Sequence, residues 1–407
     1  MRLNRRHVLG AGGAGLAAWT LGFGYPARAA GEPFRIGALD SVTGAGSPYG
    51  EGMQKAILLA AEEVNAAGGA AGRKLEVFAE DDQTAPESGV LAVKKLIEVN
   101  KANAILGTWA SAVVMAVAPI IDSAGLIHMT NAGTSALRPL DKKKLIFRYS
   151  STSLRTGAVL GRALLAEGLT KVATMAINNA SGLEVAKGAK DTVEAAGHKI
   201  VGEVVYEPNR PSYRSELQQV LAGNPQIIVM GSFLPDMTVI VREALQMGAT
   251  ARFVGPAWAA NAKLIDSLGA DATEGILTAD YVSAIGSPAF SHFKERYMKV
   301  VGSDPTENYY AACAYDMVQV LALAMEAAGP AADTPAIAAA IPRIANPPGK
   351  AVSTFAEGKQ LLAAHEKINY EGASGPIDFD ADRDVKAQFK ISVFRKGKVE
   401  FLRVISI

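Results

Sequence analysis

The chain has 407 residues, and its 41 Lys and Arg residues nearly balance its 40 Asp and Glu residues. A balanced charge gives no reason to expect nucleic acid or an anionic membrane surface as a partner. The single cysteine, Cys313, excludes an intrachain disulfide, and the five histidines are scattered without the spacing of metal ligands. We therefore expect neither a metal nor a cofactor.

The N-terminal residues have the pattern of an export signal. Arg5 and Arg6 precede an uncharged stretch rich in Gly and Ala, and residues 27–29 (Ala-Arg-Ala) offer a small-x-small cleavage site. We expect a twin-arginine-like signal peptide over residues 1–29, cleaved near Ala29, and a periplasmic location. Cleavage would remove four arginines and no acid, which leaves 37 basic against 40 acidic residues and a net charge of about −3.

The segment after this signal shows strand and helix patterns in alternation. A first series has apolar strand patterns at residues 34–39, 75–79, 104–106, 126–129 and 145–149. A second series has them at residues 172–177, 200–206, 227–230 and 253–254. Such alternation predicts parallel sheets with right-handed crossovers, and a chain of this length is too long for one core. We therefore expect two α/β lobes.

The C-terminal part of the chain has a different pattern. Residues 309–328 form one long apolar helical pattern, and residues 335–340 predict a short helix in a stretch rich in Pro and Ala. Residues 376–379 and 389–395 predict antiparallel strands. No cysteine near the cleavage site could carry a lipid, and no other long apolar segment follows the signal, so we expect no stable membrane anchor.

Small polar and aromatic residues follow the carboxyl ends of six predicted strands, the edge where open α/β sheets bind ligands. Ser111 and Thr134 lie beside backbone N–H groups at such ends, and a helix N-terminus with a hydroxyl beside it suits a carboxylate. No nucleophile elbow or Walker loop is present, so we expect a binder of small acids and not an enzyme. The candidate ligand-binding residues are Tyr49, Trp109, Ser111, Gly133, Thr134, Ser181, Phe233, Ala257 and Trp258.

Residues 33–396 resemble the periplasmic branched-chain amino-acid-binding proteins of ABC transporters, the leucine/isoleucine/valine type. The similarity rests on several segments taken together: residues 37–52 with Tyr49-Gly50, 65–72 with Asp81-Asp82, 107–134 without a gap, 231–256 and 314–316. It implies the type I periplasmic binding fold, with two doubly wound parallel-sheet lobes joined by three crossover strands and the ligand clamped between them. The expected lobes are residues 33–149 plus 280–375 and residues 150–279 plus 376–407.

The resemblance implies a carboxylate site at Ser111, Gly133 and Thr134, with Tyr49 at its mouth. The family's ammonium-binding positions do not match, because they carry Phe233, Ala257 and Ser181 here. An ammonium enclosed without a charge partner costs several kcal/mol. We therefore expect a ligand without an α-amino group, or an amine that meets another carboxylate, and the aromatic residues of the site favour an aromatic acid.

These expectations combine into one functional hypothesis. We expect an exported, monomeric solute-binding protein that captures a small carboxylate by lobe closure and delivers it to the membrane permease of an ABC transporter. The alternative is an exported ligand-sensing receptor domain that acts with a signalling partner. The sequence does not identify the ligand, the cognate permease or the export route.

Overall fold

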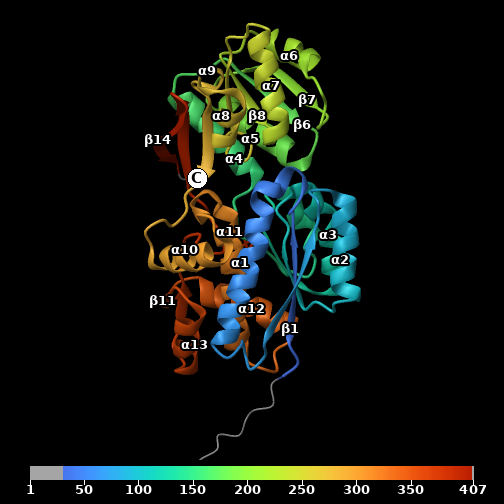
Figure 1. Cartoon of the computed structure of the whole chain (residues 1–407), viewed down its shortest axis with the longest axis vertical. Helices are drawn as coiled ribbons and strands as arrows, with labels where there is room; N and C mark the ends of the chain where they lie inside the picture. Colours follow the sequence, from blue (N-terminus) through green and yellow to red (C-terminus); the bar gives the residue numbers. More distant parts are fainter. Residues whose placement is uncertain (1–30, 406–407) are drawn as a thin grey trace, which may run out of the picture.

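The computed structural model describes residues 31–405 and shows two α/β lobes stacked along the long axis of the molecule (Figure 1). We call the lobe built on the sheet β2-β1-β3-β4-β5 the first lobe, and the lobe built on the sheet β14-β13-β10-β9-β8-β6-β7 the second lobe. A two-stranded sheet, β11-β12, completes the strand inventory of this part of the chain. The expected signal peptide lies outside the described residues.

The sheet of the first lobe is entirely parallel. Its strands are β1 (Phe34–Asp40), β2 (Leu75–Asp81), β3 (Ala104–Gly107), β4 (Ile127–Thr130) and β5 (Ile146–Arg148). The connecting helices are α1 (Ser47–Ala66), α2 (Pro86–Glu98) and α3 (Ser111–Ala124), with the 3-10 turns η1 (Gly44–Gly46) and η2 (Ser135–Leu140). Every residue of β3 and β4 is buried, as expected for central strands with helices on both faces.

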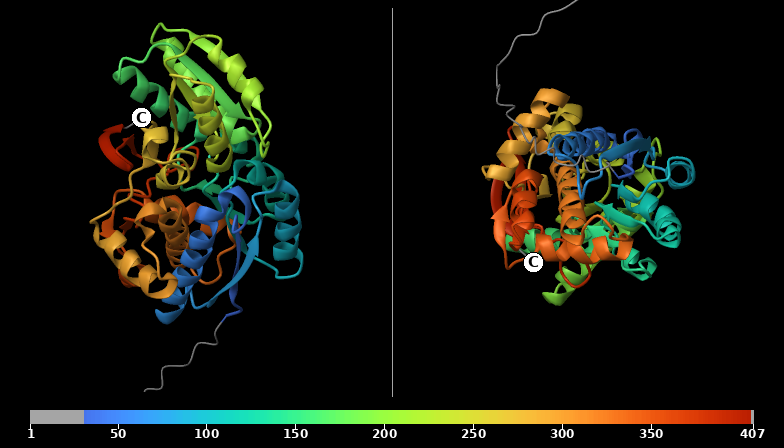
Figure 2. Two further views of the ribbon diagram at one scale, coloured as in Figure 1. Left: turned by 45° about the horizontal axis from the view of Figure 1, so that its top comes forward. Right: turned by 90° about the horizontal axis from the view of Figure 1, so that it is seen from below.

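A later segment of the chain completes the first lobe. It contains α10 (Pro288–Val301), η3 (Pro305–Glu307), α11 (Tyr309–Ala328), α12 (Thr334–Ala345), β11 (Lys350–Val352), α13 (Phe355–Ala363) and β12 (Ile368–Tyr370). Figure 2 shows α11 beside α1, against which it packs. By length and composition α11 could span a membrane, but 83% of its most apolar window is buried, which is typical of a core helix.

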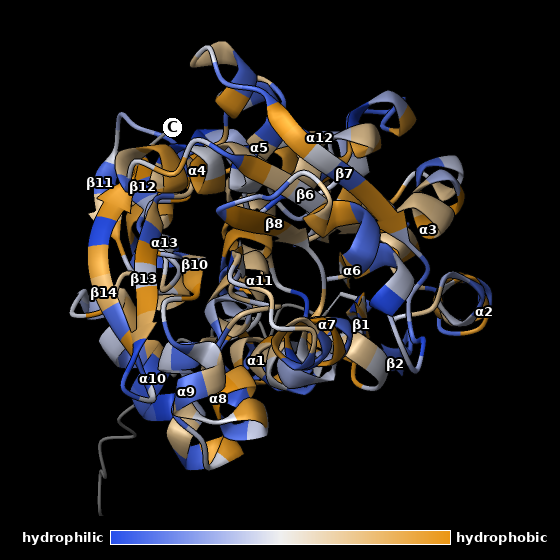
Figure 3. Cartoon of the chain, turned by 90° about the horizontal axis from the view of Figure 1, so that it is seen from above, coloured by the Kyte–Doolittle hydropathy of each residue, from blue (hydrophilic) through white to orange (hydrophobic). Residues whose placement is uncertain are grey.

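The second lobe has a mixed sheet. Its strands are β6 (Val172–Ile177), β7 (Ile200–Tyr206), β8 (Ile227–Gly231), β9 (Arg252–Pro256), β10 (Leu277–Tyr281), β13 (Phe389–Arg395) and β14 (Lys398–Ile405). Its helices are α4 (Ser153–Ala166), α5 (Ala180–Ala195), α6 (Arg214–Leu221), α7 (Leu234–Gln246), α8 (Ala262–Leu268) and α9 (Ala270–Thr273). Strand β8, which is wholly buried, is coloured as hydrophobic in Figure 3.

The structure confirms the strands of both predicted series, with ends that differ by at most two residues. The expected strand at 376–379 is wrong, because this segment forms only isolated bridges at Pro376 and Phe379. Strand β13 instead pairs antiparallel with β10 and with β14. Strand β14, which forms a hairpin with β13, was not predicted from the sequence. Lys396 and Gly397 both have positive φ, as a tight hairpin turn requires. The expected short helix at 335–340 extends over all of α12.

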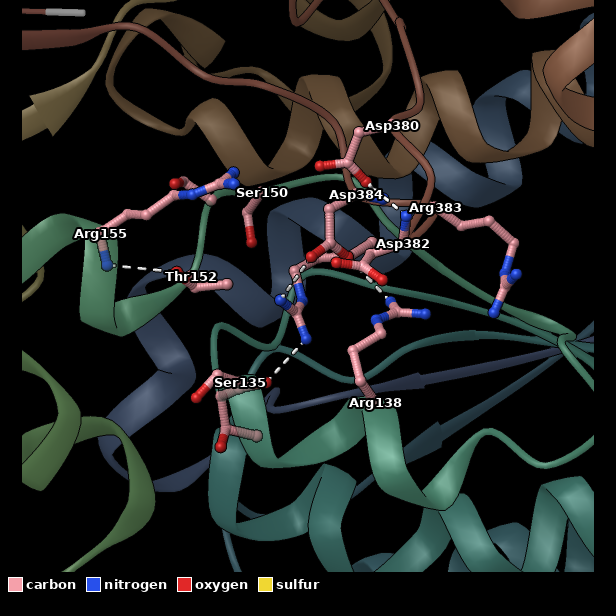
Figure 4. Close-up of polar contacts among 12 residues, drawn as sticks. Ser135, Arg138, Ser150, Thr152, Arg155, Asp380, Asp382, Arg383 and Asp384 are labelled. Carbon is pink, nitrogen blue, oxygen red and sulfur yellow. Dashed lines mark hydrogen bonds and ion pairs between the residues drawn. The ribbon is translucent and has the colours of Figure 1, made fainter. Parts of the chain in front are cut away.

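A buried ion pair joins two of the segments through which the chain passes between the lobes. Arg148, at the end of β5, is 0% exposed, and its guanidinium lies 3.0 Å from a carboxylate oxygen of Asp384. Arg138 lies 2.8 Å from the other oxygen, and Figure 4 shows Arg138 and Asp384 facing each other. The backbone of Arg148 also pairs with residues 383 and 385. These contacts fix the segment after β5 against the segment before β13.

Two buried carboxylates lie at the carboxyl ends of β1 and β2. Neither oxygen of Asp40 has a hydrogen-bond partner, whereas Asp82 accepts from the Ser41 hydroxyl at 2.7 Å. Burial and the nearby Asp82 raise the pKa of Asp40 well above its usual value. Burial raises the pKa of Asp82 to about 6, even though the Ser41 hydrogen bond lowers it. The fold therefore favours the protonated form of Asp40.

We predict that Asp40→Asn stabilises the protein at pH 7.5 by about 1–3 kcal/mol, because it removes a carboxyl that ionises freely in the unfolded chain but is prevented from ionising by burial in the fold. The folded pKa of Asp40 lies above its value of 3.8 in an exposed chain, so wild-type stability falls as the pH rises from 3.8 through the folded pKa. The gain should shrink toward pH 4. Urea unfolding at both pH values measures it.

Asp81 provides a matched control next to Asp82. Its slight burial raises its pKa, but hydrogen bonds from Thr43 and from backbone N–H groups outweigh this and lower the pKa below its usual value. Asp81→Asn should therefore destabilise the protein at pH 7.5, with a smaller effect at low pH. A loss of stability in Asp40→Asn at pH 7.5 would contradict the account.

Candidate functional site

A small cavity of about 20 Å³ lies between the two lobes, at the carboxyl ends of β3 and β4. This is room for about one water molecule, so a larger ligand requires the lobes to move apart. The residues that line it are Trp109, Ala110, Ser111, Asn131, Gly133, Ser153, Ser181, Phe233, Trp258, Tyr281 and Tyr310. Six of the nine candidate residues are among them, and Tyr49, Thr134 and Ala257 are not. Both lobes contribute residues, so the cavity lies at their interface.

Serines in the first turns of three helices form the polar part of the cavity. Ser111 is the first residue of α3, Ser153 the first of α4 and Ser181 the second of α5. The first N–H groups of a helix have no partner within the helix, and the helix dipole makes this end positive. Side chains cap α4 and α5, at Thr152 and Asn179, whereas α3 has no capping side chain. The serine hydroxyls and the uncapped end of α3 therefore supply donors, an arrangement that suits an anion.

Gly133 allows the two lobes to approach closely at this polar end. Its carbonyl accepts a hydrogen bond from the N–H of Ser153 at 2.7 Å. A Cβ atom at Gly133 would lie 2.6 Å from the Ser153 hydroxyl oxygen, which is too close for any side chain. The hydroxyls of Ser153 and Ser181 lie 3.2 Å apart and share a hydrogen bond. A side chain at this position would therefore force Ser153 at the start of α4 to shift.

Aromatic rings form the rest of the lining and meet across the cleft. The ring centroid of Trp109, from the first lobe, lies 5.7 Å from that of Phe233, from the second. Tyr310 packs edge-on against Trp109 at 5.9 Å. Tyr49 stacks on Trp109 at 5.3 Å and so forms a second layer behind the cavity wall. Flat walls of this kind suit an aromatic ring better than a branched aliphatic side chain.

None of the residues that line the cavity carries a charge at neutral pH. Burial raises the pKa values of Tyr281 and Tyr310, which keeps both phenols neutral. Between residues 31 and 405 no group of three or more His, Cys, Asp or Glu could hold a metal ion. A carboxylate here would be bound by neutral donors, whereas an ammonium would lack a charge partner among the lining residues.

Thr134 has a different contact from the one expected. Its hydroxyl donates to a carboxylate oxygen of Glu184 at 2.8 Å and accepts from the N–H of Ala136 at 3.2 Å. Glu184 lies on α5 of the second lobe and also accepts from the N–H of Ser135 at 2.9 Å and from its hydroxyl at 2.8 Å. We call this set of hydrogen bonds the Glu184 latch, because it joins the lobes beside the cavity.

Ala257 is likewise not among the residues that line the cavity. Its N–H donates to the carbonyl of Ala279 at 2.8 Å and its carbonyl accepts from the side chain of Asn261 at 2.7 Å. Its methyl group supplies neither a charge nor a hydrogen bond. The neighbouring Trp258 reaches the cavity instead.

The sequence reading missed five of the lining residues. Asn131 and Ser153 carry a local signal, because one follows the apolar run of β4 directly and the other begins a helix capped by Thr152. Ala110 lies between Trp109 and Ser111, which are both predicted ligand-binding residues. Tyr281 and Tyr310 have no local signal, since β10 and α11 reach the cleft only through the tertiary fold.

Comparisons with known proteins point to one family. A sequence model described as periplasmic binding protein matches residues 33–396. The leucine-, isoleucine-, valine-, threonine- and alanine-binding protein of Pseudomonas aeruginosa is 26% identical over 303 residues, which cover 74% of this chain and 80% of that protein.

Solved structures share the fold. The leucine-binding protein LivK of Thermotoga maritima has a TM-score of 0.76 at 23% identity, covering 91% of this chain and 98% of that one. A solute-binding protein of R. palustris in complex with 4-hydroxybenzoate has a TM-score of 0.76 at 19% identity, covering 92% and 97%. Another R. palustris protein, in complex with benzoate, has a TM-score of 0.74 at 20% identity, covering 92% and 96%.

We predict that Glu184→Ala weakens ligand binding about tenfold, because it removes hydrogen bonds that exist only when the lobes meet. The ligand-bound variant should also show a larger radius of gyration in small-angle scattering than the ligand-bound wild type. Glu194→Ala, an exposed position on the same helix, removes the same charge and should change neither value. Unchanged affinity in Glu184→Ala would refute the role of the latch.

Proposed function

The chain belongs to the family of periplasmic binding proteins and has their type I fold, and on this basis we propose that it captures an aromatic carboxylate for the permease of an ABC transporter. The family resemblance and the fold class predicted from the sequence are confirmed. The relatives are binding proteins, and we propose no catalytic activity. Export to the periplasm, as a monomer without a cofactor, is part of the proposal.

The main support for this proposal is the absence of charged residues from the lining of the cavity. Serine hydroxyls and helix N-termini at the polar end can donate to both oxygens of a carboxylate. No lining side chain can neutralise an α-ammonium group, and leaving such a charge unpaired costs several kcal/mol. Acids without the amine therefore fit better than amino acids.

The aromatic walls define the rest of the ligand. Trp109 and Phe233 come from opposite lobes and touch across the cleft, with ring centroids 5.7 Å apart. We propose that they separate when the lobes open and that a flat ring of the ligand packs against them. Two of the structural neighbours were solved with benzoate and 4-hydroxybenzoate, whereas others were solved with isoleucine or leucine. The fold thus accommodates both classes, and we assign this chain to the aromatic acids because of its lining.

Capture is proposed to occur by lobe closure. Contacts of the ligand with both lobes favour the closed state over the open one. We propose that residues 33–149 plus 280–375 and residues 150–279 plus 376–407 move as rigid bodies, except that residues 280 and 281 belong with the second lobe, whose sheet contains β10. Strand β10 ends at Tyr281, so the second crossing lies just after this strand. The Arg148–Asp384 pair, which joins two crossing segments, would limit the motion to a hinge.

We predict that benzoate and 3-phenylpropanoate stabilise the protein and that leucine, valine and phenylalanine do not. Phenylalanine and 3-phenylpropanoate differ only by the amine. The difference between their effects therefore measures the free-energy cost of enclosing the ammonium group. A ligand at 1,000 times its Kd adds about 4 kcal/mol to the free energy of unfolding, which a thermal-shift assay detects readily. A large shift with the amino acids and none with the deaminated acids would refute the proposal.

Ser111→Ala provides the control that links this binding to the cavity. It removes one hydroxyl donor from the polar end and should weaken benzoate binding about tenfold in calorimetry. Equal affinities in wild type and Ser111→Ala would place the carboxylate elsewhere.

A further inference from the structure

Asn131 is a buried polar residue of the cavity whose side chain has no partner within the protein. It follows β4 directly and is 3% exposed, and neither its amide oxygen nor its amide nitrogen forms a hydrogen bond. Its backbone is held firmly: the N–H donates to the carbonyl of Thr108 at 3.2 Å, and its carbonyl accepts from the Ser150 hydroxyl at 2.7 Å. The main chain thus fixes the amide at the cavity wall.

Other polar groups of the lining differ from Asn131 in this respect. Ser153 and Ser181 bond to each other, and the Tyr281 hydroxyl donates to the carbonyl of Ser151 at 3.3 Å. Among the lining side chains of the described chain, only that of Asn131 has both a donor and an acceptor buried without a partner. Buried polar groups are nearly always hydrogen-bonded. We therefore expect a polar group of the ligand to form the missing hydrogen bonds with the Asn131 amide.

The chemistry of the amide restricts what that ligand group can be. A carboxylate only accepts hydrogen bonds, so it would use the amide nitrogen and bring negative charge toward the amide oxygen. The serines and helix N-termini already offer the carboxylate its donors. A hydroxyl both donates and accepts, and one hydroxyl can therefore satisfy both atoms of the amide.

We propose that Asn131 is a specificity-determining residue that binds a hydroxyl substituent on the aromatic ring of the ligand. This inference rests on the proposed function and narrows it to hydroxylated aromatic acids. It assigns the two polar functions of the cavity to different groups: helix N-termini and serines bind the carboxylate, and Asn131 binds the hydroxyl.

The test compares ligand pairs by calorimetry on the whole mature protein freed of ligand. The ligands are benzoate, its three monohydroxy isomers and the three matching fluorobenzoates, which are close in size but cannot donate. At least one hydroxy isomer should bind the wild type about tenfold more tightly than its fluoro partner. In Asn131→Leu this preference should disappear, while the affinity for benzoate stays within about threefold.

Two further variants make the result unambiguous. Ser181→Ala changes another polar side chain of the same cavity and should affect both members of a pair equally. Asn131→Ala replaces Asn131→Leu if circular dichroism shows that the leucine variant does not fold. A hydroxyl preference that survives in the folded variant, or none in the wild type, overturns the role of Asn131.

The same data separate this inference from the proposed function. Benzoate binding without any hydroxyl preference overturns the role of Asn131 and leaves capture of an aromatic acid intact. If no aromatic acid binds the wild type, the proposed function fails, and the role of Asn131 fails with it.

Discussion

A charge enclosed between the lobes has to be bound by neutral groups, because no residue that lines the cavity is charged. Removing a carboxylate from water costs several kcal/mol unless several hydrogen bonds replace its hydration. The fold supplies them by directing the N-termini of α3, α4 and α5 to the cleft. These helices begin there because parallel strands end there, so the sheet topology determines which ligands can bind.

Contacts between the lobes determine whether this site exists at all. The polar end needs Ser111 and Gly133 from the first lobe and Ser153 and Ser181 from the second, and the aromatic wall likewise takes rings from both. The Glu184 latch adds hydrogen bonds that form only when the lobes meet, whereas the hinge network of Arg148 and Asp384 holds crossing segments together. Under the proposed function, closure and binding are therefore one equilibrium.

Local sequence patterns predicted the strands and most of the lining, because residues after buried parallel strands must lie at one edge of a sheet. Ser111, Ser181 and Phe233 were found in this way. The same patterns could not show that the Thr134 hydroxyl is bonded to Glu184, 50 positions later in the chain. Tyr310 was missed because it lies in the first turn of a helix whose sequence is that of an ordinary core element.

A crystal structure of the protein with benzoate tests the central claim most directly. We predict closed lobes, the carboxylate within hydrogen-bond distance of Ser111 and of N–H groups at the helix N-termini, and the ring packed against Trp109 and Phe233, which move apart to admit it. A carboxylate bound instead to an arginine or lysine, or a ring outside the cavity between the lobes, would contradict the account.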